Sequence, residues 1–329
     1  MAVTLAEMKV AMEDKVAQQV VDTFLRESEV LQMLPFDNTV SPSGGSTLTY
    51  AYVQKKLPAL ASFRELNTEY KANAATIERK TADLKIFGGK FSMDRVLKQA
   101  EGKYNNLAFQ MEEKIRAAVS LFHYTLINGD ATVNESEFDG LDKMLAGTTS
   151  ELGTGEVIDL STTDKIKQNA DQAYEALTLL IRNTGAQALL MNTSTITKIQ
   201  TVARVLGYKT ESEEAFGRKV TSMDGVRLMD LQNHYTVSDG AAVANPVVKA
   251  GISRTVGTAA TGLTDIYAVK FDVNNGFHGA TLTGTSGISQ YLPDFNQPGA
   301  VKDGEVEMVA ATVLKNTANA GVLRNVKIA

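Results

Sequence analysis

The stretch NNLAFQMEEKIRAAVSLFHYTLING, residues 105–129, predicts a long helix. Apolar residues recur in it at spacings of three and four, which places them on one side of a helix: Leu107, Met111, Ile115, Ala118, Val119, Phe122 and Leu126. Asn105 or Asn106 is expected to cap its start, and Gly129 is expected to end it in a left-handed conformation. At about 1.5 Å per residue such a helix spans about 35 Å, the length of a strut across a whole domain.

The chain ahead of this helix begins with a second helical pattern, over residues 3–34. Its apolar residues recur mostly at threes and fours, and Pro35 ends it because proline disfavours a helical residue before it. Two interpretations stay open. The segment is either an ordinary amphipathic helix docked on its own core or an arm that docks on a neighbouring chain.

A glycine-bracketed hairpin is expected next. Residues 46–55 and 76–87 have strand patterns, and Gly44-Gly45 and Gly88-Gly89 bracket them. The connection between the strands is interpreted as a polar tip, so the hairpin could not build a core by itself and would need another surface. It is either a flexible surface hairpin or an arm that reaches over a neighbouring subunit. The two glycine pairs are the expected hinges.

The rest of the chain predicts an α+β fold. A short helix is expected over 92–100, and a turn-rich passage after Gly129 is expected to be anchored by apolar side chains. A helix over 163–183, a buried strand over 186–192 and a helix to about Val205 follow, and the remainder is rich in strand patterns.

Composition argues against several classes of protein. The 329 residues carry a formal charge of −5 and no cysteine, so disulfides and thiolate sites are excluded. No apolar run is long enough for a membrane span, and no phosphate-binding, dinucleotide or hydrolase motif is present. His123 is interpreted as a packing or hydrogen-bonded residue, and the acidic residues 130, 135, 137 and 139 as a solvated turn. We therefore predict no enzyme activity, no catalytic residue, no cofactor and no metal.

Read in order, these elements resemble the major capsid proteins of tailed phages with the HK97-like fold. The motifs that carry the resemblance are FRELNTEY (63–70), MDRVLKQA (93–100), LINGD (126–130) with FDGL (138–141), ALLMNTST (188–195), FGRKVTSMDGVRLMD (216–230) and EVEMVAATVLKNTANAGVL (305–323).

The resemblance implies a division of nearly the whole chain. It places an N-terminal arm at 1–36, an extended loop at 37–91, a peripheral domain with the spine helix at 92–148 and an axial domain at 149–300, with parts returning to the peripheral domain. Residues 301–329 would be C-terminal strands of the peripheral domain.

The resemblance also implies a function in assembly. Copies would form hexamers and pentamers of an icosahedral phage head that encloses double-stranded DNA without reading its sequence. A portal, a separate scaffolding protein (since the chain begins directly with the arm) and decoration proteins are implied partners. In the extended loop, Arg64, Glu65, Glu69 and Lys71 are the expected inter-subunit contacts. Covalent crosslinking through a lysine and an asparagine has no alignable position here.

Two alternatives stay open at this point. An encapsulin-type nanocompartment would share the fold but store an enzyme, although the long arm and loop favour a phage. A soluble enzyme or binding protein, with the hairpin as a lid, would be a monomer or dimer with a ligand pocket. The absence of a catalytic constellation disfavours it.

Overall fold

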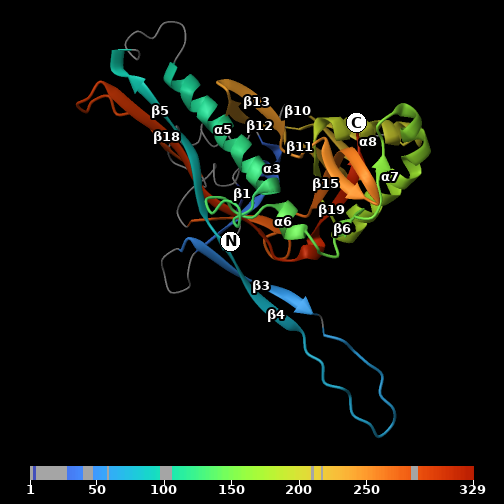
Figure 1. The fold of residues 1–329 in the computed structure, drawn as a ribbon. Coiled ribbons are helices and arrows are strands. Elements are labelled where there is room, and N and C mark those ends of the chain that lie inside the picture. Colours follow the sequence, from blue (N-terminus) through green and yellow to red (C-terminus); the bar gives the residue numbers. More distant parts are fainter. Residues whose placement is uncertain are drawn as a thin grey trace.

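Among the described residues the architecture comprises two large sheets, a long helix, the small hairpin of β12 (Asn233–Ser238) and β13 (Ala241–Pro246), and a second hairpin that projects from the body (Figure 1). The computed structural model describes residues 3–4, 28–39, 47–57, 59–96, 106–208, 211–215, 218–282 and 288–329. Among the described residues, no helix is long and apolar enough to cross a membrane. The mixture of helix and sheet confirms the predicted α+β class.

The long helix α5 (Asn106–Asn128) confirms the central prediction. The residues predicted for its inner side lie in the core, at 7% exposure or less except for the partly buried Leu107: Met111, Ile115, Ala118, Val119, Phe122 and Leu126. The helix packs on strands β5 (Lys85–Asp94) and β18 (Val301–Leu314). Periodicity alone identified it because packing of one apolar face is the main source of helix stability in proteins.

Gly129 ends α5 for a different reason from the one predicted. It does not have a positive φ, and its N–H still donates to the carbonyl of Thr125 at 2.9 Å. A Cβ at this position would lie 2.2 Å from the carbonyl oxygen of Phe138. The glycine is therefore required by the close approach of the returning chain and not by a left-handed turn.

The first sheet has six strands, and α5 packs against two of them, β5 and β18. Its order is β1 (Val3–Thr4), β2 (Pro35–Asn38), β16 (Phe277–Thr281), β18, β17 (Ile288–Tyr291), with β5 also paired to β18. Strand β2 is parallel to β16, and the remaining pairs are antiparallel. Strand β18 is paired with β5 over all ten residues of that strand.

The described ends of the N-terminal segment belong to the chain's own body. Val3–Thr4 forms strand β1 and not the start of a helix, and α3 (Glu29–Met33) is a single short helix ahead of Pro35. Val30 and Leu31 are at most 1% exposed in the main core. His123 fixes the segment further, because its Nε2 lies 2.6 Å from the Ser28 hydroxyl and its Nδ1 lies 3.1 Å from the Leu231 carbonyl oxygen. The packing interpretation of His123 is confirmed, and residues 5–27 lie outside the described part.

Gly88 and Gly89 are not the hinges that the sequence suggested. Both lie inside β5, opposite Glu307 and Val306 of β18. A Cβ on Gly88 would lie 1.9 Å from the carbonyl oxygen of Val306, so the glycine permits a close approach of two strands. Gly44 and Gly45 lie outside the described residues.

The helix expected over 92–100 begins later than predicted. Ser92, Met93 and Asp94 continue β5, and helical backbone is described only at Arg95 and Val96. The long ladder to β18 extends the strand over residues whose local sequence favours a helix. Residues 97–100 lie outside the described part.

The second sheet has nine strands and carries two helices. Its path is β6 (Glu151–Leu152), β19 (Ala320–Lys327), β15 (Thr258–Val269), β8 (Ala188–Met191), β11 (Val226–Asp230), β10 (Arg218–Met223) and β9 (Glu211–Ala215). Strand β14 (Ile252–Val256) pairs with β15, and β7 (Ile158–Asp159) pairs with β19.

Helices α7 (Thr163–Thr184) and α8 (Thr193–Val205) pack on this sheet, as the sequence predicted. All four residues of β8 are fully buried, because alternate side chains enter the two cores on either side of the sheet. A short helix, α6 (Leu141–Leu145), follows the turn after α5, with Phe138 and Leu141 buried as anchors.

Candidate functional site

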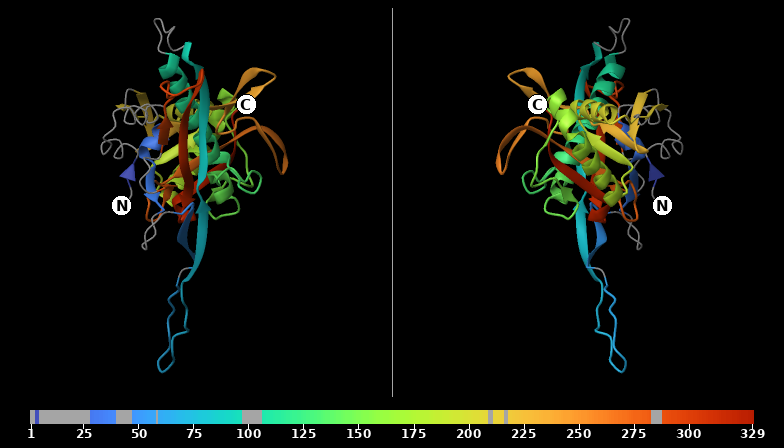
Figure 2. Two further views of the ribbon diagram at one scale, coloured as in Figure 1. Left: turned by 90° about the vertical axis from the view of Figure 1, so that its left-hand side faces the viewer. Right: turned by 90° about the vertical axis from the view of Figure 1, so that its right-hand side faces the viewer.

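The projecting hairpin is made of β3 (Thr49–Leu57) and β4 (Thr76–Asp83), joined by a long tip. The two strands pair antiparallel from Thr49↔Asp83 to Leu57↔Thr76. Within the described part of the chain they form a sheet of their own. Figure 2 shows the hairpin standing away from the body in both views. Tyr50 is buried and Tyr52 is partly buried at the root, but the outer part of the ribbon is exposed. A two-stranded ribbon is marginally stable by itself, so this geometry favours burial of the outer part against another surface.

The tip of the hairpin carries large apolar side chains that have no cover. Phe63 is 106% exposed, Leu66 87%, Leu60 70% and Tyr70 62%. The expectation of a polar tip is therefore wrong in composition, because four large apolar residues stand among its charges. Their presence in LPALASFRELNTEY was the available signal. A run of exposed apolar residues on a projecting arm is typical of an interaction surface.

The predicted contact residues all lie in this tip and are exposed: Arg64, Glu65, Glu69 and Lys71. Arg64 is used partly within the tip, where it donates to the carbonyls of Glu65 and Thr68 at 3.4 and 3.1 Å and lies over the Tyr70 ring. The arginine thus shapes the turn. Their contact with another subunit stays a prediction.

The root of the hairpin is anchored to the first sheet. The N–H of Leu84 donates to the Leu48 carbonyl at 2.6 Å, and the Tyr50 hydroxyl donates to Asp37 at 2.6 Å. The Tyr50 ring meets the buried His278 edge-on at 5.7 Å, and Lys315 lies on the ring at 5.4 Å. Burial and the bond to Asp37 raise the pKa of Tyr50. The tip is thus free and the root is fixed.

His278 makes stability at the hairpin root depend on pH. Burial, with a contribution from Lys315, lowers the pKa of this fully buried imidazole from 6.5 to about 4. As the pH falls below about 6.5, His278 of the unfolded chain becomes protonated, whereas His278 of the folded chain becomes protonated only near pH 4. We therefore expect the free energy of unfolding to decrease by up to about 3 kcal/mol as the pH falls from about 6.5 to about 4.

A comparison of His278→Leu with the parent chain tests this prediction. Urea unfolding at pH 7.5 and 4.5 should show that the free energy of unfolding decreases less at low pH in the variant than in the parent. Carboxylates also titrate in this range, but they are common to both chains, so the difference between the chains reports on His278. The variant His234→Gln is the comparison: burial lowers the pKa of His234 as well, but this side chain is only partly buried, so its replacement should change the loss of stability less. Equal losses in His278→Leu and the parent would contradict the prediction.

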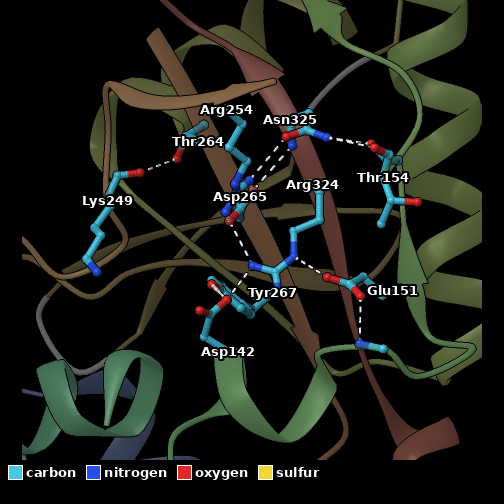
Figure 3. Close-up of polar contacts among 12 residues, drawn as sticks. Asp142, Glu151, Thr154, Lys249, Arg254, Thr264, Asp265, Tyr267, Arg324 and Asn325 are labelled. Atoms are coloured by element: carbon cyan, nitrogen blue, oxygen red, sulfur yellow. Dashed lines mark hydrogen bonds and ion pairs between the residues drawn. The ribbon is translucent and has the colours of Figure 1, made fainter. Parts of the chain in front are cut away.

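A second polar constellation, the junction cluster, lies inside the body (Figure 3). It consists of Asp142, Glu151, Arg254, Asp265, Tyr267, Arg324 and Asn325. These residues come from α6, β6, β14, β15 and β19, so the cluster joins segments up to 182 residues apart.

Asp265 is the centre of the junction cluster and is 2% exposed. Each of its two oxygens accepts a hydrogen bond from one terminal nitrogen of Arg254 at 2.6 Å, and Arg324 donates a third hydrogen bond at 2.9 Å. Arg324 also donates to Glu151 at 2.8 Å and to Asp142. Every polar partner needed for a buried ion cluster is thus supplied by the chain.

A bulge in the sheet brings these groups together. Thr264 is opposite Val326 and Ile266 is opposite Leu323, so Asp265 faces two residues of β19. One of them, Asn325, has a φ of 61°, a conformation that asparagine tolerates better than most residues. The bulge places the side-chain amide of Asn325 within 2.9 Å of the Gly153 carbonyl.

The charges of the cluster stabilise one another's ionised forms. Burial alone would lower the pKa of Arg324, but the carboxylates of Asp142 and Asp265 outweigh it and hold that pKa above the ordinary value. Burial likewise opposes ionisation of Asp142, and the bonds from Arg324 still hold its pKa below the ordinary value. Burial raises the pKa of Tyr267 well above 10, so its hydroxyl stays neutral and donates to Asp142. The cluster is a fixed structural unit without a free nucleophile or base.

The acidic turn after α5 is held by a lysine. Lys143 donates to Asp130 at 2.6 Å and to Asp139 at 2.8 Å. The bonds from Lys143 and Thr132 lower the pKa of Asp130 to about 2. Within the described ranges, no three histidine or acidic side chains are grouped closely enough to hold a metal ion.

Comparison of sequences identifies no relative: no family model and no curated protein matches the chain. Comparison of structures gives many matches. The SrpI encapsulin of Synechococcus elongatus is similar over 96% of both chains, with a TM-score of 0.57 and 14% identity. The capsid of a native GTA particle covers 92% of this chain and 90% of its own, with a TM-score of 0.55 and 12% identity.

A chain of Mycobacterium phage Ogopogo gives the same result. It covers 90% of this chain and 91% of its own, with a TM-score of 0.54 and 14% identity. Each of these matches covers 90% or more of the chain. The protein described here therefore has the HK97-like α+β fold that its sequence predicted.

Proposed function

We propose that this chain is a structural subunit whose copies assemble into the icosahedral head of a tailed double-stranded DNA phage. The observation that carries the proposal is the projecting hairpin, whose apolar tip has no partner in its own chain. Its burial on another copy would supply the stability that a two-stranded ribbon lacks. The likeness of the fold to capsid and encapsulin chains supports the same interpretation.

We assign the two large sheets to different parts of the subunit. The long helix and the six-stranded sheet form the peripheral part, and the nine-stranded sheet with α7 and α8 forms most of the axial part of a hexamer or pentamer. Residues 301–329 were expected to be strands of the peripheral domain, but we assign only β18 to that part, because β19 belongs to the second sheet. A portal, a separate scaffolding protein and decoration proteins are the proposed partners, with the virion as the location.

An encapsulin-type compartment is the second candidate. The observation that favours it is the 96% mutual coverage with the SrpI encapsulin. Both candidates require closed shells and differ in what the shell contains.

Electron microscopy and sedimentation of the purified chain test the proposal. We expect closed shells, or rings of five and six copies, either from the chain alone or with its scaffold co-expressed. Nucleic acid inside the shells would support the phage head, and a co-purifying enzyme would support the compartment. A uniform monomer or dimer under both conditions would overturn both candidates.

A further inference from the structure

His278 is buried at the point where the projecting hairpin joins the body. It lies in β16 and is 0% exposed. Within the described part of the chain, neither of its ring nitrogens makes a hydrogen bond of normal geometry. Buried polar side chains are normally hydrogen-bonded, as His123 is to Ser28 and to the Leu231 carbonyl. The surroundings of His278 therefore accommodate its neutral form and leave it without a fixed polar role.

Four charged or titratable side chains face His278 from other parts of the body and from the hairpin. Burial and the positive charge of Lys315 disfavour a proton on the imidazole, whereas Asp37 and Asp272 favour one. Burial and Lys315 outweigh the two acids, so the folded chain keeps the imidazole neutral down to about pH 4. The four side chains are Lys315 directly after β18, Asp272 in the connection before β16, Asp37 of β2 and Tyr50 of β3.

Asp37 lies on the same face of the first sheet as His278. In the parallel pair of β2 and β16, Asp37 is opposite Ala280, and side chains two residues apart in a strand share a face. His278 and Asp37 are therefore diagonal neighbours, at a spacing that long side chains can bridge. In the folded chain Asp37 accepts the hydrogen bond of the Tyr50 hydroxyl at 2.6 Å. A protonated His278 would be a second donor for the same carboxylate.

Tyr50 joins one strand of the hairpin to the body. Its ring covers His278 edge-on at 5.7 Å and lies 5.4 Å from the Lys315 ammonium, and its hydroxyl binds Asp37. The other strand, β4, continues through Leu84 into β5, which the long ladder to β18 holds in place. Loss of the Tyr50 contacts would weaken the hold on β3 while β4 stays attached. The ribbon could then change its angle to the body.

We propose that Tyr50, Asp37 and His278 form a proton-controlled latch that sets the angle of the projecting hairpin. At neutral pH the Tyr50 hydroxyl binds Asp37, and the Tyr50 ring covers the neutral imidazole. When His278 takes a proton from solvent, the imidazolium donates to Asp37, the Tyr50 hydroxyl loses its acceptor, and the ring moves away so that water reaches the charged imidazole. The latch lies within one chain and does not depend on the proposed function.

Proton binding and release of the latch favour each other by the same factor. When the ring of Tyr50 moves away, His278 is exposed to water and recovers its ordinary pKa of 6.5, against about 4 under the ring. The ratio of released to latched chains should therefore rise by up to about 70-fold between pH 7.5 and pH 4.5.

The first test measures the angle of the hairpin in dilute, unassembled subunits. The chain has no cysteine, so spin labels on Ile77→Cys in β4 and Glu175→Cys on α7, both exposed positions, report a single distance. Electron–electron resonance should show an additional distance at pH 4.5 in the parent chain, and only the pH 7.5 distance in a labelled chain with His278→Leu.

A control label pair, Phe109→Cys on α5 with Glu175→Cys, lies wholly within the body and should give one distance at both pH values. A change in this pair at pH 4.5 would mean that acid loosens the whole body, and it would overturn the latch. So would an unchanged distance from Ile77→Cys in the parent, or an equal change in the His278→Leu chain.

The second test measures the reciprocal effect by nuclear magnetic resonance of the histidine side chains. The chain has three histidines, so the signal of His278 is identified by its loss in His278→Leu. Tyr50→Phe keeps the ring but frees Asp37 for the imidazolium, so the proton affinity of His278 should rise at least about tenfold. Tyr52→Phe, at the partly buried tyrosine two residues along β3, is the matched control and should leave that affinity unchanged. Equal proton affinities in Tyr50→Phe and the parent would overturn the proposal.

Discussion

Excision of residues 49–83 is expected to abolish shell assembly and to leave a folded, soluble monomer. The excision removes the buried Tyr50 and its contacts with Asp37 and His278, but the tip and most of β4 are exposed, so the greater part of the core remains in place. Leu48 and Leu84 already lie side by side, with an N–H···O distance of 2.6 Å, so a short glycine linker can close the gap. The excision spares Lys85, where the ladder to β18 begins.

Sedimentation and electron microscopy measure this result, with circular dichroism to check the fold. The matched control keeps the ribbon and replaces Glu69 and Lys71 by Ser, because an exposed ion pair predicted for either residue would be worth only about 0–1 kcal/mol. We expect the control to assemble at a modestly higher protein concentration. Closed shells of normal size from the excised chain would show that the hairpin is dispensable.

The sequence predicted the elements that are local and failed where the structure depends on distant strands. Helix α5 and helix α7 follow from their own periodicity, so their limits were predicted to within a residue or two. Strand β5 was cut short and its glycines were assigned to a hinge, because its partner β18 is more than 200 residues away along the chain. A glycine required by a neighbouring strand looks, in sequence, the same as a glycine in a turn.

The junction cluster shows a signal that was present but not used. Asp265 stands in the strand LTDIYAV and Arg324 in GVLRNV, single charges within apolar runs. Lone charges in buried strands are paired in folded proteins, because an unpaired buried ion is too costly. That reasoning pairs Asp265 with some arginine, but only the register of β15 and β19 identifies Arg324. The hairpin tip is the opposite case, since its role is decided by a surface outside the chain.

Removal of the central carboxylate, by Asp265→Asn, is expected to destabilise the body by about 3 kcal/mol or more, because it breaks buried ion pairs by taking away one partner. The asparagine amide has one acceptor oxygen, so it cannot accept both hydrogen bonds from Arg254 as the two carboxylate oxygens do. Arg324, whose side chain is only 8% exposed, loses an ion-pair partner. Replacement of the whole group by a smaller apolar side chain would leave a cavity in addition.

Urea unfolding of dissociated subunits measures the change. Asp303→Asn is the matched control: Asp303 pairs with Lys90 at 2.7 Å, but both side chains are about half exposed, so its loss should cost far less than the loss of Asp265. The same chemical substitution is thereby compared inside and outside the core. A loss for Asp265→Asn no larger than for Asp303→Asn would mean that solvent, and not the ion cluster, satisfies Arg254 and Arg324. The five segments would then be held together by apolar packing alone.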